Sequence, residues 1–406
     1  MSDLVRVLHT GDFHIGAPYR KLRGKNVEEL RRGDIKRNFV SIVDRAIAEK
    51  VDLFLISGDV FHSPRPYSND FVFFSEQIGR LTGRGVKVVV IAGNHDKPKS
   101  RDFDHQLSAL VKVHAPNFYF LQNLPDEPLI IDLEEKSTKV GIVALPYVEP
   151  RFVEELCVPY NSFVRGEIKR LLDFDSLGDV DFKILVAHLV VSGAVVREIP
   201  SLYLRDPRVG RDDLLFKEFD YVALGHVHQH QRLADNMYYC GSIERLDFSE
   251  INDEKFFNIV NLSGEGLTVN EIPLSLRPMY RISYDKLSSV EDPIGEVIEF
   301  IKRWGVEQGS IVKLVISGDL HAVGRLKRSV NVLERKLEDD LNIVGYDLEI
   351  RSRRIYGDIK KYSAELKYNL REIILDYVRS LTGVSEDVKK RALKFAEEII
   401  DEVGLP

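Results

Sequence analysis

Aspartate, asparagine and histidine recur in five short motifs, and each motif directly follows a hydrophobic run. The motifs are Gly11-Asp12-Phe13-His14, Gly58-Asp59, Gly93-Asn94-His95-Asp96, Ala187-His188 and Gly225-His226-Val227-His228. The runs before them predict buried parallel strands at residues 4–9, 52–57, 86–92, 182–187 and 221–224. Sites in open α/β sheets form at the carboxyl ends of the strands, so we expect the motifs to converge on one pocket. Polar residues at buried strand ends need partners, and a metal centre supplies them.

The residue types indicate which metals would bind and what reaction would follow. Carboxylate, amide and imidazole ligands without thiolate suit Mn²⁺, Fe²⁺ or Mg²⁺. The candidates are too many for one ion, and two ions roughly 3.5–4 Å apart can clamp a phosphoryl group and activate a water. Aspartate is the natural bridge, because its two oxygens can reach both ions. His95, which directly follows the candidate ligand Asn94, can face the leaving oxygen as an acid or an electrostatic stabiliser.

Each candidate taken alone has a simpler structural explanation. A lone histidine on an apolar strand, such as His188, is usually a hydrogen-bonded core residue. Asn94 beside a glycine is typical of a turn, and Asp12 and Asp59 could cap helices. The joint pattern outweighs these explanations, and Asp96 is expected to brace its loop. Five further histidines are interpreted as bystanders: His9, His105, His114, His230 and His321.

The elements that must position the motifs follow from hydrophobic periodicity. Two stripes at helical spacing lie between the first three strands, which predicts a parallel sheet with right-handed crossovers over residues 1–120. The stripes are Ile35, Phe39, Ile42, Val43, Ala46 and then Phe71, Phe74, Ile78, Leu81. The shorter runs of residues 129–275 predict a second sheet packed on the first. Pro273 and Pro278 mark a boundary, after which 279–356 alternates strand and helix and 359–403 forms two helical stripes around Thr382-Gly383.

Composition bounds the class of protein and its partners. A chain of 406 residues usually needs more than one core, so we expect two or three domains. With Cys157 and Cys240 as its two cysteines, we expect a reducing, intracellular setting. Met1 is followed almost at once by the first strand, and no apolar run reaches membrane-spanning length, so we expect neither a signal peptide nor a membrane partner.

The charge of the chain is unevenly distributed. The formal net charge of −7 argues weakly against nucleic acid. Residues 20–37 nevertheless carry eight basic residues against three acidic ones, directly after the first motif: Arg20, Lys21, Arg23, Lys25, Arg31, Arg32, Lys36 and Arg37 against Glu28, Glu29 and Asp34. A basic stretch beside a phosphate site suits a polyanionic substrate, although a solvated helix face is an equal alternative.

The series DxH, GD, GNHD, H and GHxH resembles that of the calcineurin-like metallophosphoesterases, over residues 1 to about 275. Within that superfamily, the chain is most similar to meiotic-recombination-eleven type DNA repair nucleases, including their bacterial SbcD relatives. The block Gly58-Asp59-Val60-Phe61-His62 resembles the GDxFH block of these nucleases, and the Asp-Arg-Gly element of protein phosphatases is absent after this GD.

The resemblance implies a two-sheet α/β/β/α sandwich at residues 1–277, a small α/β capping domain at 278–357 and a C-terminal helical hairpin at 358–406. It implies a Mn²⁺-dependent nuclease of a double-strand-break repair complex, with 3′-to-5′ exonuclease action on duplex ends and endonuclease action on single strands. Another phosphodiesterase of the superfamily, or a non-catalytic scaffold subunit, remains an alternative.

The resemblance also implies roles for the motif residues. The first of two Mn²⁺ ions, for which Mg²⁺ or Fe²⁺ could substitute, would be held by Asp12, His14, Asp59 and His228. The second would be held by Asp59, Asn94, His188 and His226, with Asp59 bridging. His95 would be a catalytic histidine that binds no metal, and His62 would support the site or contact phosphate. Phe13, inside the first motif, is expected to point away from the metals.

Three partners are expected on the same ground: DNA, a second copy of the chain and an SMC-like coiled-coil ABC ATPase of the Rad-fifty or SbcC type. The ATPase would bind residues 358–406, for which Arg351-Ser352-Arg353-Arg354 could start a linker. The second copy would pack on Phe71-Val72-Phe73-Phe74 and on the stripe Leu107, Leu110 and Val111. We expect a cytoplasmic protein associated with the nucleoid.

Overall fold

The computed structural model describes residues 4–19, 21–97, 104–196, 206–288, 291–352, 377–378 and 384–403. The chain divides into two compact units, Met1–Arg351 and Ser352–Pro406, which are described separately below. Cys157 is exposed and Cys240 is buried, and neither forms a disulfide. Within the described residues, no helix is both long and apolar enough to span a bilayer.

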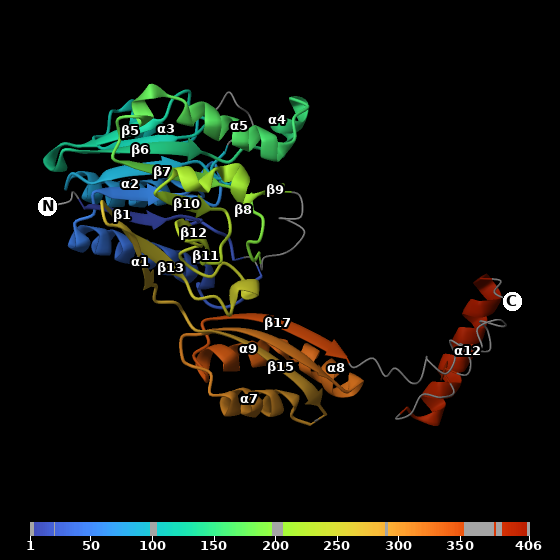
Figure 1. Ribbon diagram of the computed structural model, residues 1–406. Helices are drawn as coiled ribbons and strands as arrows, with labels where there is room; N and C mark the ends of the chain where they lie inside the picture. Colours follow the sequence, from blue (N-terminus) through green and yellow to red (C-terminus); the bar gives the residue numbers. More distant parts are fainter. Residues whose placement is uncertain are drawn as a thin grey trace. The chain divides into compact units, whose positions relative to one another are not determined.

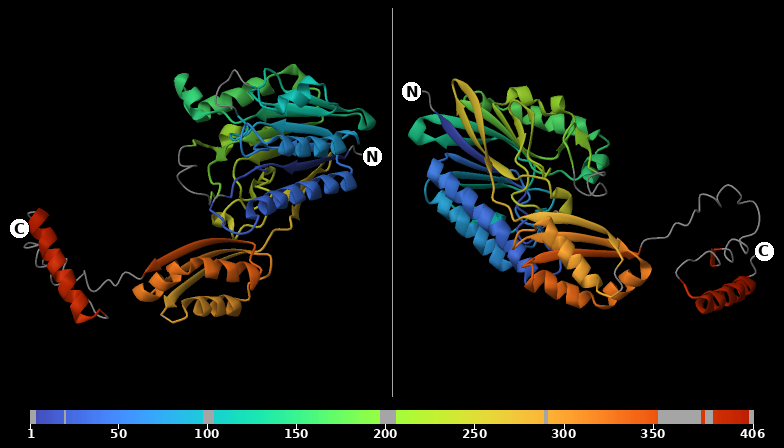
Figure 2. Two further views of the ribbon diagram at one scale, coloured as in Figure 1. Left: turned by 180° about the vertical axis from the view of Figure 1, so that it is seen from behind. Right: turned by 90° about the horizontal axis from the view of Figure 1, so that it is seen from below.

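The first sheet is built around the predicted parallel strands. Its order is β14-β13-β1-β2-β3-β4. Strands β1 (Val5–Thr10), β2 (Leu53–Ile56), β3 (Lys87–Ile91) and β4 (Phe118–Leu121) run parallel, which confirms the predicted core of this sheet. The helices α1 (Val27–Glu49) and α2 (Ser68–Thr82) cover its outer face side by side, and α3 (Ser108–Lys112) precedes β4 (Figure 2).

Two later strands extend this sheet, so the assignment of all of residues 129–275 to the second sheet was wrong. Strand β13 (Phe256–Ser263) pairs antiparallel with β1, and β14 (Gly266–Pro273) pairs antiparallel with β13. The physical reason is that β1 would otherwise be an edge strand with unpaired backbone groups. A returning strand satisfies those groups, and local periodicity does not show which edge such a strand will join.

The second sheet packs on the first and supplies the remaining motifs. Its order is β11-β12-β10-β7-β6-β5. The strands are β5 (Leu129–Leu133), β6 (Thr138–Leu145), β7 (Phe182–His188), β10 (Tyr221–Gly225), β11 (Gln231–Ala234) and β12 (Met237–Tyr239). The helices α4 (Pro150–Glu155) and α5 (Tyr160–Leu172) belong to its outer layer, and β8 (Val190–Val191) pairs with β9 (Arg208–Val209) beside it.

Burial between the two sheets holds the sandwich together. Val7, Leu55 and Val89 of the first sheet share one buried cluster with Ile142 and Val186 of the second. Figure 1 shows the two sheets stacked, with α4 and α5 beyond the second sheet and α1 beyond the first. These layers confirm the α/β/β/α architecture, and they bring the carboxyl ends of β1, β2, β3, β7 and β10 to one region.

A cap module, residues 279–352, has its own sheet and core. Its strands β15 (Met279–Leu287), β16 (Ile311–Gly318) and β17 (Gly345–Ser352) lie in that order. The helices are α7 (Pro293–Trp304), α8 (Leu320–Arg328) and α9 (Val330–Asp339), so the second predicted helix is in fact two. His321 lies in the first turn of α8, capped by Asp319, which confirms its interpretation as part of a strand-to-helix turn.

The second unit contains the helix α12 (Glu386–Val403), which matches the second predicted C-terminal stripe. The first stripe, from Tyr362 to Leu381, lies outside the described residues apart from Tyr377. Arg353 and Arg354 of the predicted linker, and Thr382-Gly383 between the stripes, also lie outside them. The helical hairpin therefore stays a prediction.

Candidate metal centre

The motif residues lie in strained loops directly after the strands. Asp12, His14, Asp59 and His226 all adopt positive φ, an unusual backbone conformation for these residues that concentrates at functional sites. The first two loops are tied together, because the amides of Asp12 and His14 donate to the carbonyls of Gly58 and Asp59 at 2.9 and 3.0 Å. A Cβ atom at Gly93 would collide with the carboxylate of Asp59, so only glycine allows the third loop to approach so closely.

One group of side chains gathers Asp12, His14 and His228 within reach of a single ion. The Nε2 atoms of His14 and His228 lie 3.0 Å apart. The Oδ2 atom of Asp59 is 3.5 Å from His14 Nε2. The structure thus brings together all four residues expected to hold the first metal.

A second group lies directly beside the first and contains Asp12, Asp59 and His188. Asn94 Oδ1 is 3.1 Å from His188 Nε2 and 2.9 Å from His226 Nδ1. Asp59 Oδ2 is 3.6 Å from His188 Nε2, so this carboxylate touches both groups, as expected of a bridge. Asp12 also belongs to both groups, which the sequence did not suggest.

The electrostatics of these residues fit divalent cations. Burial raises the pKa of Asp59 well above its usual value, and the nearby carboxylates of Asp96 and Asp12 raise it further. Burial and neighbouring imidazoles lower the pKa values of His14 and His188, which leaves both rings neutral with a lone pair to donate. Carboxylates crowded together in a buried site, among neutral imidazoles, lack a positive partner. Two divalent ions would supply it, and the nitrogen and oxygen donors suit Mn²⁺, Fe²⁺ or Mg²⁺.

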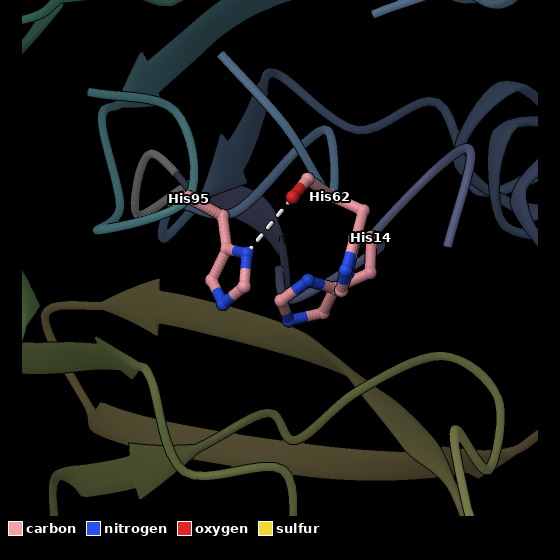
Figure 3. A group of neighbouring side chains, drawn as sticks. All are labelled: His14, His62 and His95. Atoms are coloured by element: carbon pink, nitrogen blue, oxygen red, sulfur yellow. Dashed lines mark hydrogen bonds between the residues drawn. The ribbon is translucent and has the colours of Figure 1, made fainter. Parts of the chain in front are cut away.

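His95 and His62 lie beside the first group rather than within the paired ligands. The ring of His95 is 4.7 Å from that of His14, measured between centroids. Its Nδ1 donates to the carbonyl of His62 at 2.9 Å, which leaves Nε2 on the opposite side of the ring (Figure 3). The backbone amide of His95 donates to Asp59 Oδ1 at 2.8 Å, so the catalytic candidate is held directly against the bridging carboxylate.

Asp96 and Phe13 are placed as expected. Asp96 is buried and accepts hydrogen bonds from the amides of Val60, Phe61 and Gly93, so it braces the loops. Phe13 packs on Phe39 of α1, with 4.7 Å between ring centroids, in the core between that helix and the first sheet.

Three bystander histidines have structural contacts. His9 is bonded to the hydroxyl groups of Tyr221 and Ser57, and His230 to Asn258. His105 is buried and its Nδ1 accepts from the amide of Leu107. None of these histidines is among the side chains grouped around a candidate ion within the described residues.

Two carboxylates in contact with the histidines of the fifth motif were missed by the sequence analysis. Glu250 Oε1 is 3.0 Å from His228 Nδ1, and Asp206 Oδ2 is 3.0 Å from His226 Nε2. Burial disfavours the charge of Glu250, but the Lys255 ammonium and the bond with His228 outweigh it and lower its pKa to about 2. Neither acid belongs to a motif, and an isolated acidic residue in a loop gives no signal in the sequence.

A cleft of about 670 Å³ opens beside this centre. Four of the site histidines line it, together with basic residues from three parts of the chain: His14, His62, His95, His228, Lys21, Arg31, Arg245, Arg281 and Lys313. The cap module therefore forms one wall of the cleft, through Arg281 and Lys313.

The predicted basic stretch is only partly placed at this cleft. Arg23 pairs with Glu334 and Lys25 with Asp339, both of α9 in the cap module. Arg31 is buried against Asp34 and Glu244, and Lys36 pairs with Asp70. Arg20 lies outside the described residues. Much of the positive charge of this stretch is therefore matched by acidic neighbours, and the idea that all of it faces substrate was wrong.

One family profile and several known proteins match this chain. The profile described as Calcineurin-like phosphoesterase matches residues 5–230. The DNA double-strand break repair protein Mre11 of Aeropyrum pernix is 29% identical over 289 residues, which cover 69% of this chain and 63% of that protein. The SbcD component of the nuclease SbcCD of Escherichia coli K12 is 24% identical over 277 residues, covering 64% and 65%. The Mre11 protein of Methanosarcina acetivorans is 24% identical over 410 residues, covering 99% and 58%.

Each of these alignments covers less than two thirds of the relative's own length. Among solved structures, TT1561 of Thermus thermophilus covers 66% of this chain and 99% of its own, at 14% sequence identity and a TM-score of 0.36.

Proposed function

Because the chain belongs to the calcineurin-like phosphoesterase family, we propose that it is the nuclease subunit of a DNA double-strand-break repair complex. The similarity to Mre11 and SbcD proteins supports this substrate class. The observation that carries the proposal is the convergence of the seven predicted ligands, from five strand ends in two sheets, on one pocket. A scaffold without catalysis would not need to keep this set of donors together.

The same residues would hold the metal ions. Asp12, His14, Asp59 and His228 would bind the first, and Asp59, Asn94, His188 and His226 the second. When bound, a pair of Mn²⁺ ions would polarise the scissile phosphate and lower the pKa of the attacking water. The burial of these ligands keeps competing water away from their donor atoms.

His95 would act on the leaving oxygen. The carbonyl of His62 accepts the Nδ1 proton of His95 and fixes the plane of its ring. When protonated, the ring would present a second proton at Nε2 and could donate it to, or stabilise, the departing oxygen. The backbone carbonyl of His62 would thus orient His95, while the imidazole of His62 lies 5.6 Å from that of His14 and lines the cleft where phosphate would enter.

The cleft would bind the DNA backbone. Lys21 and Arg281 are exposed cations on opposite walls, one from the loop after the first motif and one from β15. Phosphate groups between them would be neutralised from two sides. We propose 3′-to-5′ exonuclease action on duplex DNA and endonuclease action on single strands, both dependent on Mn²⁺.

Two protein partners complete the proposal. The helix α12 exposes Val388 and Phe395 and would dock by helix-in-groove packing on the coiled-coil base of an ABC ATPase. Deletion of residues 352–406 should then abolish co-purification with that ATPase, and unchanged binding would disprove the docking role. A second copy of the chain would pack on the exposed apolar side of α2 and α3. The complex would act in the cytoplasm, at the nucleoid.

The test of the substrate class compares two substrates under one set of conditions. Purified full-length protein would be incubated with Mn²⁺ and either linear duplex DNA or a chromogenic phosphodiester. We expect Mn²⁺-dependent degradation of the duplex. Cleavage of the small diester without any cleavage of DNA would favour another phosphodiesterase of the superfamily, and inactivity on both would favour a scaffold subunit.

A further inference from the structure

The two histidines of Gly225-His226-Val227-His228 present opposite ring nitrogens to the candidate metal centre. His228 directs Nε2 toward His14, at 3.0 Å from its Nε2. His226 directs Nδ1 toward the second group, at 2.9 Å from Asn94 Oδ1 and 3.2 Å from His188 Nε2. A neutral imidazole has a proton on one nitrogen and a lone pair on the other, so these neighbours must adopt opposite tautomers to bind metal.

A carboxylate lies at the other nitrogen in both cases. Glu250 Oε1 is 3.0 Å from His228 Nδ1, and Asp206 Oδ2 is 3.0 Å from His226 Nε2. An ionised carboxylate can only accept, so each acid would fix the proton on the ring nitrogen that faces away from the metal. We propose that Glu250 and Asp206 are positioning residues of the two-metal centre, each setting the tautomer and orientation of one histidine ligand. The inference rests on the proposed function only in assuming that metals bind here.

Glu250 is itself held rigidly. It is buried in the segment after β12, and Lys255 Nζ donates to its Oε2 at 2.6 Å. The same ammonium donates to the carbonyl of His228 at 2.9 Å. Lys255 therefore holds both the acid and the backbone of the histidine that the acid orients. Because an ammonium can only donate, the Glu250 position nearest Lys255 must be an oxygen.

Asp206 is anchored by a partner of different chemistry. The hydroxyl of Tyr147 donates to Asp206 Oδ1 at 3.1 Å, and the amide of Tyr147 donates to the carbonyl of Ala92, just after β3. The ring of Tyr147 lies 6.0 Å from that of His226, between centroids. A hydroxyl can donate or accept, so this partner tolerates an oxygen or an amide nitrogen at that position.

The difference between Lys255 and Tyr147 predicts different outcomes for amide variants. In Glu250→Gln, Lys255 would hold the amide oxygen, so the amide nitrogen would face His228 Nδ1 and favour the wrong tautomer. In Asp206→Asn, the hydroxyl of Tyr147 can turn to accept, so the amide oxygen can still face His226. Asp206→Ala removes the acceptor altogether. Glu244 provides a matched control, since it is a buried acid of the same segment that pairs with Arg31 and not with a site histidine.

The experiment measures Mn²⁺ binding to the metal-free, full-length protein by calorimetry. Co²⁺ absorption spectra report ligand geometry, and thermal unfolding without metal shows that each variant folds. We expect Glu250→Gln and Asp206→Ala each to weaken one of the two binding events about 10- to 100-fold and to change the Co²⁺ spectrum, as for other partners of metal-binding histidines. Asp206→Asn and the control Glu244→Gln should bind both ions as the wild type does.

Wild-type Mn²⁺ affinities in Glu250→Gln and Asp206→Ala would overturn the proposal, as would an equal loss of affinity in Glu244→Gln. If Glu250→Gln does not fold, Asp206→Ala decides the matter alone, because Asp206 is at the surface of the site. A wild-type protein that binds two ions but never cleaves DNA would refute the proposed function and leave this inference standing.

Discussion

The Nε2 atoms of His14 and His228 lie 3.0 Å apart, although 214 positions separate the two residues in the chain. His14 follows β1 in the first sheet and His228 follows β10 in the second. Their lone pairs can meet only when the two sheets are packed face to face. The candidate centre is therefore a product of the sandwich, and damage to the packing between the sheets would also damage the site.

Removal of the His95 ring should separate catalysis from metal binding. His95→Ala keeps the backbone amide that donates to Asp59, so both ions should still bind. Cleavage of DNA should fall by ~10²–10⁴-fold, the usual contribution of a positioned acid or base. Calorimetric Mn²⁺ titration and an exonuclease assay on the same samples test this, with Asp59→Ala as the variant that should lose metal. A fully active His95→Ala enzyme would rule out the catalytic assignment.

The two cations on opposite walls of the cleft should carry DNA binding. Replacing Lys21 and Arg281 with alanine should weaken binding and lower the log–log salt slope by roughly 0.9 for each B-DNA phosphate that is no longer neutralised. The control is the double variant Arg23→Ala and Lys25→Ala, which removes the same charge from residues paired with the cap module. Titrations at several salt concentrations, with metal omitted, provide the slopes. Equal slopes for the wild type and the Lys21 and Arg281 variant would show that DNA binds elsewhere.

Asp34 should stabilise the junction between α1 and the cap module. Arg277 donates to both of its carboxylate oxygens at 2.7 Å, and Arg31 donates at 2.8 Å. Burial opposes the charge of Asp34, but the hydrogen bonds of Arg277 and the charge of Arg31 outweigh it and hold its pKa below 3.8. Asp34→Asn should therefore lower the free energy of unfolding at pH 7 by about 3 kcal/mol, the cost of breaking a buried ion pair.

The effect of this substitution should depend on pH in one direction. A carboxyl whose folded-state pKa is lowered stabilises the protein above its unfolded pKa, and this contribution disappears as pH falls through the folded value. The difference between wild type and Asp34→Asn should thus shrink below pH 3.8. Asp44→Asn, at an exposed ion pair with Arg80, should change stability by less than about 0.5 kcal/mol. A difference that grows on acidification would contradict the assignment.

Self-association should depend on exposed apolar residues of α2 and α3. Val72 is 52% exposed and Val111 is 40% exposed, whereas Leu107 of the predicted stripe is fully buried. Leu107 therefore belongs to the core, and the idea that its side chain faces a second copy was wrong. Val72→Asp combined with Val111→Asp should convert a dimer to monomers in light scattering, while Val158→Asp at another exposed valine should not. A monomeric wild-type protein at micromolar concentration would disprove the dimer.

The sequence predicts the ligands well because each follows a strand end that hydrophobic periodicity locates. Other features depend on long-range partners that periodicity does not show. The pairing of β13 with β1 and the ion pair between Arg23 and Glu334 are two such features, as are the contacts of Glu250 and Asp206 with the site histidines. Leu107 was misplaced for a local reason: it lies at the start of the five-residue helix α3, which is too short for a helical stripe to define its buried side.

The most direct measurement of the central claim is an anomalous difference map at the manganese edge from crystals grown with Mn²⁺. The proposed centre predicts two peaks roughly 3.5–4 Å apart. One should lie among Asp12, His14 and His228, the other among Asn94, His188 and His226, with Asp59 between them. A single peak, or peaks at other residues, would contradict the two-metal centre and with it the proposed mechanism of DNA cleavage.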